Sequence, residues 1–276
     1  MPQFHKSALK WPGGKTRVLK KLMPLLNNKK ALRLIEPFAG SAVVFLNIPS
    51  RDYVLSDISS DLINFFRQLR RHHHRFIQDA CMLFSLNNEH DYYRLRKEFN
   101  HCEDAYRKAL LFIYLNRHGY NGLWRVNNSG LCNVPYGRYR APYFPRDEML
   151  YMAFRLASAE IRCSHYLQVV SEAGSGDMIY ADPPYLPGSE TANFTAYHQS
   201  GFHWDDHVKL AESLVEANKR DAQVVISNSY TKSSLELYKD LGFSTRKIEV
   251  MRSISNNAAS RKCANEIIGW IKNPQL

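Results

Sequence analysis

The sequence has few of the features that mark secreted, disulfide-bonded or membrane-spanning proteins. Its 5 cysteines are widely spaced and form no CxxC pair, which argues against a disulfide framework and against a cysteine zinc site. The first residues lack the apolar segment of a signal peptide, and no uninterrupted apolar run approaches membrane-spanning length. We therefore expect a cytoplasmic protein.

Acidic residues are missing from two long stretches of the chain. Residues 1–35 contain nine Lys and Arg but no Asp or Glu, and residues 105–146 contain seven more basic residues and again no acid. The formal net charge of the 276 residues is +11. Basic charge gathered in this way favours a polyanionic partner, with nucleic acid ahead of a membrane surface.

Two short motifs resemble binding sites for other ligands but lack essential parts. His72-His73-His74 has no companion ligands at helical or turn spacing, so a solvated helix face is the better interpretation and we expect no metal site. Gly13-Gly14-Lys15-Thr16 is similar to part of a P-loop. A P-loop requires a glycine five residues before Gly14, where this chain has Leu9, and no strand precedes the motif.

Residues 32–70 have the pattern of a parallel α/β sheet. The apolar run 32–36 ends at Pro37, and a short helical stretch follows at 42–46, which predicts strand, tight loop and helix. A second short strand is predicted at 53–56, followed by a helix from about Ser59 to Arg70. This alternation is typical of the opening of a parallel sheet.

The pattern then changes before strand signals resume. Residues 76–115 are helical in character, and residues 116–145 are rich in Asn, Gly, Tyr, Arg and Pro with weak periodicity. Strands are predicted again at 178–181 and 223–227, and an antiparallel pair at 244–251 and 266–271 closes one edge of the sheet. We therefore predict an α/β fold in which a mostly parallel sheet, covered on both faces, is formed by residues 1–57 and 146–276. A mainly helical, basic lobe is inserted at 58–145.

Four of the predicted strands end in polar residues, namely Glu36, Asp57, Asp182 and Asn228. Ligands of parallel α/β sheets bind at the carboxyl ends of the strands, so we expect these four side chains around one crevice. Acids after strands are also common helix caps, and for any single one of them that alternative is the better interpretation.

The most specific motif in the chain is Asp182-Pro183-Pro184-Tyr185. An exocyclic amine of a nucleobase is a poor nucleophile, and acceptors on its two N–H groups favour the pyramidal geometry that it needs to attack a sulfonium methyl. The Asp182 carboxylate and the Pro183 carbonyl can supply those acceptors on a turn stiffened by prolines. Tyr185 offers a flat face for an extruded base. The alternative is a proline-rich turn after a strand.

With this tetrapeptide, the chain resembles the Dam-type DNA adenine methyltransferases. That family has the same tetrapeptide at its catalytic strand end. Three motifs of its methyl-donor region are matched by Lys10-Trp11-Pro12-Gly13-Gly14-Lys15, Glu36-Pro37-Phe38-Ala39-Gly40 and Ser56-Asp57-Ile58. Further matches, in the family's order, lie at residues 115–123, 133–139, 191–198 and 252–255. The resemblance implies a Rossmann-like methyltransferase fold, S-adenosylmethionine as methyl donor, and transfer to N6 of a flipped adenine, with GATC as the target site.

The resemblance also assigns the donor-binding residues. Gly40 lets the backbone approach a ligand, Asp57 is placed to accept hydrogen bonds from ribose hydroxyls, and Trp11 offers an aromatic wall to a sulfonium cation. A tryptophan taken alone is more often a core residue than a ligand contact. The predicted donor-binding residues are Trp11, Lys15, Glu36, Phe38, Gly40, Asp57 and Asp182, and the predicted catalytic residues are Asp182, Pro183 and Tyr185.

Recognition of DNA is assigned to the inserted lobe and to Lys10. An Arg guanidinium can donate hydrogen bonds to both O6 and N7 of a guanine, and Leu or Pro can contact a thymine methyl. The alternative is a polar loop with an ordinary surface Arg. The resemblance implies that Arg125, Leu123 and Pro135 read base edges, Tyr120 intrudes on the base stack, Lys10 reads the outer guanine, and Asn121 and Arg138 contact the backbone or its surroundings. Trp124 and Tyr136 are unusual residues for their positions, and Trp124 is expected to influence flanking-sequence preference.

The predicted reaction is a single in-line displacement that needs neither a metal nor a covalent enzyme intermediate. We expect double-stranded DNA as the partner, a monomeric enzyme, and room for two molecules on one DNA. One alternative is an amino methyltransferase acting on cytosine N4, RNA or a protein glutamine. Cytosine-N4 enzymes typically have a Ser-Pro-Pro-Tyr motif and glutamine enzymes an Asn-Pro-Pro-Tyr motif, so Asp182 argues against these two. Another is a DNA-binding protein that has lost catalysis.

Overall fold

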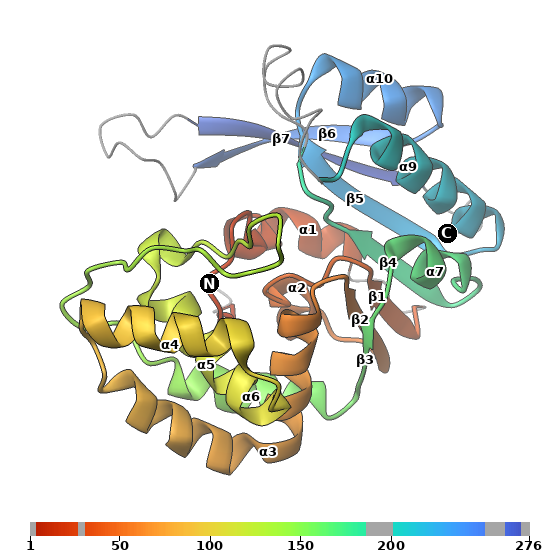
Figure 1. Cartoon of the computed structure of the whole chain (residues 1–276). Coiled ribbons are helices and arrows are strands. Elements are labelled where there is room, and N and C mark those ends of the chain that lie inside the picture. The colour runs from red at the N-terminus through yellow and green to blue at the C-terminus, as the bar shows by residue number, and fades with distance from the viewer. Residues whose placement is uncertain (1–3, 27–30, 186–200, 252–262, 272–276) are drawn as a thin grey trace. The chain divides into compact units, whose positions relative to one another are not determined.

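The computed structural model describes residues 4–26, 31–185, 201–251 and 263–271, and it divides into two compact units (Figure 1). Two of the matched segments, residues 191–198 and 252–255, lie outside the described residues. The first unit contains residues 1–16, 40–47 and 59–163, and the second contains residues 17–39, 48–58 and 164–276. The first unit thus includes residues 59–145 of the predicted insertion together with the N-terminal motif.

The second unit is built on a β-sheet and contains six of the seven strands found in the described residues. In space they follow the order β2-β1-β4-β5-β7-β6. Their bounds are Arg33–Glu36 (β1), Asp52–Asp57 (β2), Asp177–Ala181 (β4), Gln223–Ser229 (β5), Ser244–Met251 (β6) and Cys263–Ile271 (β7). β1 is parallel to both β2 and β4, and β4 is parallel to β5, whereas β7 is antiparallel to β5 and β6. The predicted mixed α/β class with a mostly parallel sheet is confirmed, as is the antiparallel pair at its edge.

In the described part of the second unit there are four α-helices: α1 (Leu19–Leu26), α7 (Tyr166–Ser171), α9 (Trp204–Lys219) and α10 (Lys232–Asp240). The helices α7, α9 and α10 lie over the sheet and contribute to the apolar core of this unit. Every residue of β4 is buried, as expected for a central parallel strand covered on its faces. The ends of α9 and α10 are fixed by capping boxes, in which Asp206 and Ser234 accept from the backbone N–H groups of His203 and Thr231.

The first unit is mainly helical. Its α-helices are α2 (Val43–Asn47), α3 (Ser60–Phe84), α4 (Glu89–His101), α5 (Ala105–His118) and α6 (Arg146–Leu156), with a 3-10 turn η2 (Tyr120–Gly122) and one strand, β3 (Ala159–Cys163). A second 3-10 turn, η1 (Lys15–Arg17), lies at the change from the first unit to the second. Side chains from Ser59, Asn88 and Asp104 cap α3, α4 and α5 at their N-termini.

Helix α3 is longer than the predicted helix that ends near Arg70. It contains a non-helical residue at His72 and then continues to Phe84. The continuation is explained by the apolar residues beyond the kink, since Phe76 is fully buried and contacts the ring of Phe65. A hydrophobic face that resumes after one irregular residue restores the helix, because burial of that face outweighs the local break. No helix among the described residues is long and apolar enough to cross a membrane.

Candidate functional site

Asp182 follows directly on strand β4, at the carboxyl edge of the sheet in the second unit. The parallel register of β4 and β5 pairs Ala181 with Ile226. The next residue on each strand is therefore Asp182 and Ser227, respectively, and the two side chains meet. The Ser227 hydroxyl donates a hydrogen bond of 2.8 Å to Oδ1 of Asp182. A neighbouring strand thus fixes the carboxylate in one orientation.

A second hydroxyl extends this arrangement into the core. The oxygen of Tyr180 lies 2.8 Å from Oγ of Ser227, and both residues are buried. Because Ser227 has one proton and donates it to Asp182, Tyr180 must be the donor to Ser227. Burial, and then the charge of Asp182, raise the pKa of Tyr180 well above its usual value, so the phenol keeps its proton. The direction of both hydrogen bonds is therefore set.

Tyr185, the last residue of the tetrapeptide, is held by strand β7. Its hydroxyl donates a hydrogen bond of 2.8 Å to Oε2 of Glu266, a residue that pairs with Ser229 of β5. Burial, and then the charge of Asp182, raise the pKa of Tyr185 well above its usual value. The ring is neutral and anchored at its far end, which suits a side chain that must present a fixed flat face.

The neighbouring strand ends supply more carboxylates. Glu36 ends β1 and is buried, and Asp57 ends β2 and is partly buried. The loop after β1 is fastened to β2 by a 2.8 Å hydrogen bond from the Ala39 N–H to the Ser56 carbonyl. The carboxyl ends of parallel strands lie at one edge of a sheet, so the acids Glu36, Asp57 and Asp182 share that edge.

Phe38, another predicted donor-binding residue, takes part in an aromatic cluster. Its ring stacks on Tyr166 of α7 with 5.3 Å between centroids, and it meets the edge of Phe202 at 5.6 Å. Phe38 is partly buried against the core of the second unit. The side chain is therefore fixed by packing, which holds the start of the predicted donor loop in one position.

The structure places Asn228 differently from our expectation. Its side chain is fully buried, donates to the Tyr238 hydroxyl at 3.0 Å and lies 3.1 Å from Nδ1 of His207. Successive residues of a strand point to opposite faces of the sheet. Because Ser227 reaches Asp182, Asn228 has to face the helices α9 and α10. The polar group that β5 contributes beside Asp182 is the hydroxyl of Ser227.

The other predicted donor-binding residues, Trp11, Lys15 and Gly40, lie in the first unit. Lys15 is buried, and its ammonium donates to the Gly13 carbonyl at 2.7 Å. Gly40 has a φ of +47° and lies against the indole of Trp11, so that a Cβ at this position would stand 3.1 Å from Nε1. Glycine is thus required here both by the backbone conformation and by the close approach of the indole.

The loop that carries Leu123 and Arg125 is fastened at two points. The indole of Trp124 packs edge-on against Phe112 of α5 at 4.3 Å and against Phe99 of α4 at 5.4 Å. Beyond it, Val126 and Cys132 form an isolated antiparallel bridge that closes a short hairpin. Trp124 is therefore an anchor of this loop. Arg125 itself is exposed, and among the described residues it has no ion-pair or hydrogen-bond partner.

The returning arm of the hairpin is held on α4 by side chains that bind its backbone. Asn100 accepts from the Cys132 N–H at 2.8 Å and donates to the Cys132 carbonyl at 3.1 Å. Arg96 and Tyr92 both donate to the Val134 carbonyl, at 2.8 and 3.0 Å. Polar side chains of α4 thus bind the backbone N–H and C=O groups of this irregular segment, as a neighbouring strand would do in a sheet.

The two remaining loop segments are joined to each other. The Tyr120 N–H donates to the Pro135 carbonyl at 2.9 Å, and Gly119 forms a bridge with Tyr136. Tyr120 is 40% exposed, which leaves much of its ring accessible. Asn121 and Arg138 both have positive φ, at 51° and 52°. Asn adopts this conformation readily, whereas for Arg it is uncommon. Arg138 makes a loose, exposed ion pair with Glu89 at 3.8 Å, which is weak in solvent.

Lys10 is positioned by α5. The Asn116 side chain accepts from the Lys10 N–H at 2.9 Å and donates to the Lys10 carbonyl at 2.7 Å, and Asn116 is fully buried. The Lys10 ammonium lies 4.2 Å from the ring centre of Tyr139. Burial, and then the charge of Arg117, lower the pKa of Lys10. At Gly122 a Cβ would overlap the Lys10 side chain, so the loop and Lys10 are in direct contact.

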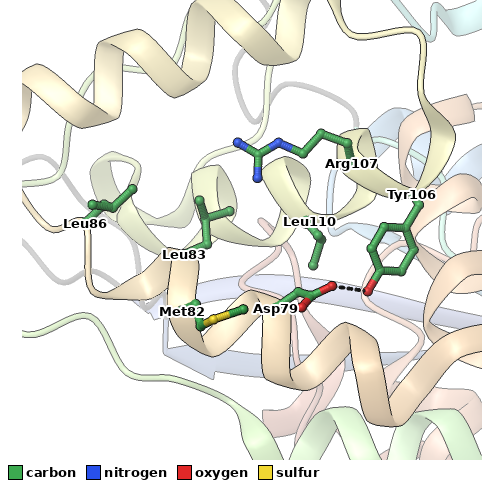
Figure 2. Close-up of a pocket in the computed structure, with 7 residues that line it drawn as sticks. All are labelled: Asp79, Met82, Leu83, Leu86, Tyr106, Arg107 and Leu110. Atoms are coloured by element: carbon green, nitrogen blue, oxygen red, sulfur yellow. Dashed lines mark hydrogen bonds between the residues drawn. The ribbon is translucent and has the colours of Figure 1, made fainter.

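A hollow of about 450 Å³ on the first unit is lined by none of the predicted site residues. Figure 2 shows it between α3 and α5, with the Tyr106 hydroxyl donating to Asp79 at 2.7 Å across one side. The residues that line it are Asp79, Met82, Leu83, Leu86, Tyr106, Arg107 and Leu110.

Ser227, Tyr180, Glu266 and Asn116 were not among the predicted site residues. Strand alternation contains a signal for the first, because in a strand that ends near residue 228 only one of two adjacent polar residues can face the site. The Tyr180 and Glu266 contacts depend on pairing between distant strands, and the Asn116 contact joins residues 106 apart in sequence. Local sequence patterns do not reveal such contacts.

Comparison with known proteins agrees with the chemistry of this edge. Residues 11–254 match the family described as D12 class N6 adenine-specific DNA methyltransferase. The chain belongs to this family, and it is an enzyme of DNA adenine methylation. It is 40% identical to the DNA adenine methylase of Serratia marcescens over 96% of this chain and 97% of that protein. The corresponding values for the DNA adenine methylase of Escherichia coli strain K12 are 40%, 97% and 96%.

A phage relative is also similar over nearly the whole chain. The DNA N-6-adenine-methyltransferase of Escherichia phage P1 is 38% identical over 97% of this chain but only 35% of that protein. Among solved structures, a precorrin-6y C5,15-methyltransferase from Geobacter metallireducens has a TM-score of 0.42 at 9% identity, covering 98% of this chain and 99% of that one. A likeness of that degree carries no functional inference.

Proposed function

We propose that the chain transfers a methyl group from S-adenosylmethionine to N6 of an adenine flipped out of double-stranded GATC sites. Membership of the family supports the reaction and the DNA substrate. The names of the bacterial relatives support methylation of adenine in DNA, and the GATC site rests on the resemblance of the recognition motifs to those of the Dam-type enzymes. The observation on which the proposal mainly depends is the orientation of Asp182 at the end of β4 by the 2.8 Å hydrogen bond from Ser227.

Asp182 and Pro183 have the chemistry to prepare the amine. The carboxylate accepts one N–H of the adenine amino group and the backbone carbonyl of Pro183 accepts the other, so that the nitrogen lone pair turns out of conjugation and toward the methyl group. Because the carboxylate is already fixed by Ser227, little reorganisation is needed when charge develops. Tyr185, anchored through its hydroxyl, stacks on the extruded base.

The carboxylates at the sheet edge suit the methyl donor. S-adenosylmethionine supplies an activated methyl on a cationic sulfonium. Glu36 is a buried acid at the end of β1, and Asp57 stands at the end of β2. Acids in these places provide negative charge toward a cation and acceptors for ribose hydroxyls. Trp11, Lys15, Phe38 and Gly40 complete the proposed donor-binding set, and we propose no metal in the reaction.

The first unit provides the proposed DNA contacts. Arg125 is exposed on a loop whose neighbour, Trp124, is anchored inside the unit, so the guanidinium is presented on a fixed support. Tyr120 is exposed enough to enter a base stack. We assign base reading to Lys10, Leu123, Arg125 and Pro135, intrusion to Tyr120, and contacts to the backbone or its surroundings to Asn121 and Arg138. A monomer acts at each site in this proposal, and two molecules can occupy one DNA.

The proposal is tested by methylating a random-sequence duplex pool and sequencing the modified sites. We expect N6-methyladenine within GATC, and Asp182→Ala enzyme should leave the pool unmethylated while still binding DNA. Modified adenines spread over many contexts would contradict the proposed site specificity. Sedimentation of the enzyme, free and on duplexes with one site, measures how many molecules act together.

A further inference from the structure

The hydroxyls of Tyr180 and Ser227 form a hydrogen-bonded chain that ends on Asp182, and the mechanism stated above gives Tyr180 no role. Tyr180, Ser227 and Asp182 are joined by two hydrogen bonds of 2.8 Å, and they come from the adjacent parallel strands β4 and β5. Ser227 is 1% exposed and Tyr180 is 2% exposed, so neither hydroxyl can reach bulk solvent. Their proton positions are fixed by the rest of the molecule.

We propose that Ser227 is a positioning residue for methyl transfer, which orients the Asp182 carboxylate toward the adenine amine, and that Tyr180 fixes the proton of Ser227. This inference rests on the proposed role of Asp182. Ser227 does not touch the substrate in this scheme and is not a catalytic residue.

The geometry explains why two hydroxyls are needed. A serine hydroxyl can rotate and can either donate or accept. With Tyr180 as a donor on its oxygen, Ser227 has its proton left only for Asp182. Tyr180 cannot reverse the arrangement by ionising, because burial raises the pKa of its phenol. The pair therefore keeps Oδ1 of Asp182 occupied as an acceptor and holds the plane of the carboxylate.

The register of the strands makes this contact specific to one residue of β5. Ala181 pairs with Ile226, which places residue 227 beside residue 182. The next residue, Asn228, points to the opposite face and binds Tyr238 and His207. A serine is short enough to fit between two strands and to donate across them.

The test compares Ser227→Ala, Ser227→Thr and Tyr180→Phe with the parent in single-turnover methylation of a random-sequence duplex pool at saturating donor. We expect Ser227→Ala to slow transfer about ten- to a hundredfold, as for loss of a hydrogen bond to a charged group, with unchanged Kd for DNA and for S-adenosylhomocysteine. Ser227→Thr keeps the hydroxyl and should recover most of the rate. Tyr180→Phe should slow transfer severalfold.

Two further measurements separate positioning from a general loss of structure. Tyr180 acts through Ser227, so Tyr180→Phe should add nothing to the effect of Ser227→Ala in the double variant. Ser234→Ala removes a serine of the same unit that is equally buried and caps α10. It should lower stability and leave the transfer rate at the parent value.

The outcomes decide the two proposals separately. Transfer by Ser227→Ala at the parent rate overturns the positioning role, as does additivity of the two variants or a loss of ligand affinity in place of rate. Because the pool contains every short sequence, methylation outside GATC would reject the proposed site while leaving the comparison of rates valid.

Discussion

The two compact units hold their proposed functional side chains by different means. In the second unit the polar groups stand at the ends of paired strands, and the register of the strands decides which of them meet, as with Asp182 and Ser227. In the first unit the proposed DNA contacts lie on irregular loops. Those loops are fastened by polar side chains of helices, such as Asn100 and the buried Asn116, which bind loop backbone.

The difference matches the two tasks that we propose for the units. A methyl transfer needs acceptors fixed to a fraction of an ångström, and a sheet provides that through many cooperative hydrogen bonds. Base reading requires side chains that project from the surface, and loops on a rigid support provide such side chains. We therefore expect changes in the second unit to alter the rate on every sequence, and changes in the first unit to alter the choice among sequences.

The largest effect should come from Asp182→Asn. The amide keeps the size of the side chain, but it removes the negative charge. We expect kcat to fall by about 10²–10³, in the range found when one preorganised group for a developing charge is lost. The fall should be equal on GATC and on every near-cognate duplex that the parent enzyme methylates. Rates on a panel of single-pair variants measure this, and a sequence-dependent fall would break the separation of tasks between the units.

The second-largest effect is expected for Arg125→Ala, which should change sequence preference. A bidentate Arg–guanine pair contributes about 1–3 kcal/mol of discrimination, so we expect roughly a ten- to hundredfold loss of preference at one base pair. Methylation of near-cognate sites should persist. The panel is measured at two salt concentrations, because an Arg that binds phosphate weakens all sequences and lowers the salt slope by about one unit. Arg140→Ala, another exposed arginine of this lobe, is the matched control.

Trp11 and Asp57 test whether the N-terminal motif of the first unit works with the sheet of the second. Ala variants of each should raise the KM for the methyl donor about tenfold, as for loss of one good contact to a charged ligand. The KM for DNA should change much less. If Trp11→Ala instead weakened DNA binding and left donor binding unchanged, the motif would belong to the recognition surface.

Asn116→Ala should disturb the support of Lys10. It removes two reciprocal hydrogen bonds from a fully buried amide, and we expect the free energy of unfolding to fall by about 1–3 kcal/mol. Urea titration measures it. Asn64→Ala is the control and should lower the free energy of unfolding less, because this amide is only partly buried, donates to the Ala105 carbonyl at 2.8 Å and accepts a long bond from Gln68 at 3.3 Å. Preference at the outer base pair should also relax, and unchanged discrimination would show that Lys10 needs no such support.

The smallest effect is a loss of stability in acid that both units should share. Burial lowers the pKa of His118 in the first unit and of His207 in the second to about 4, below the usual 6.5. Because the folded pKa lies below that of the unfolded chain, the stabilisation is complete above pH 6.5 and is lost as pH falls toward 4. When the pH is lowered from 7 to 5.5, each histidine should reduce the free energy of unfolding by about 1 kcal/mol. Urea titrations of His118→Gln and His207→Gln should each show a weaker pH dependence than the parent.

Much of the fold follows from local sequence patterns. The strands at β1, β2, β4 and β5 were predicted because short apolar runs end in turn residues, and the edge pair β6–β7 because two such runs follow each other. Strand β3 was not predicted, although apolar and polar residues alternate in its five-residue sequence Ala-Glu-Ile-Arg-Cys. The end of α3 was wrong because the hydrophobic face resumes beyond His72.

The site was predictable where one motif contains the chemistry and not where distant segments meet. Asp182 stands out in the sequence through its neighbours. Its partner Ser227 is one of two adjacent polar residues, and only the register distinguishes it from Asn228. From its place in a polar loop, Trp124 looks like a surface aromatic residue. Its indole instead packs against Phe112 of α5 and Phe99 of α4, and the sequence around Trp124 does not indicate either contact.

The hairpin clamp on α4 has a consequence for how such enzymes change. The hydrogen bonds from Asn100, Arg96 and Tyr92 go to main-chain atoms of Cys132 and Val134. Main-chain atoms are the same for every amino acid except proline, so these hydrogen bonds do not depend on which side chains the segment displays. If the segment reads bases as we propose, displayed residues can be exchanged to give new target preferences while these hydrogen bonds stay intact. This part of the molecule is a natural place to begin when a methyltransferase of altered sequence preference is wanted.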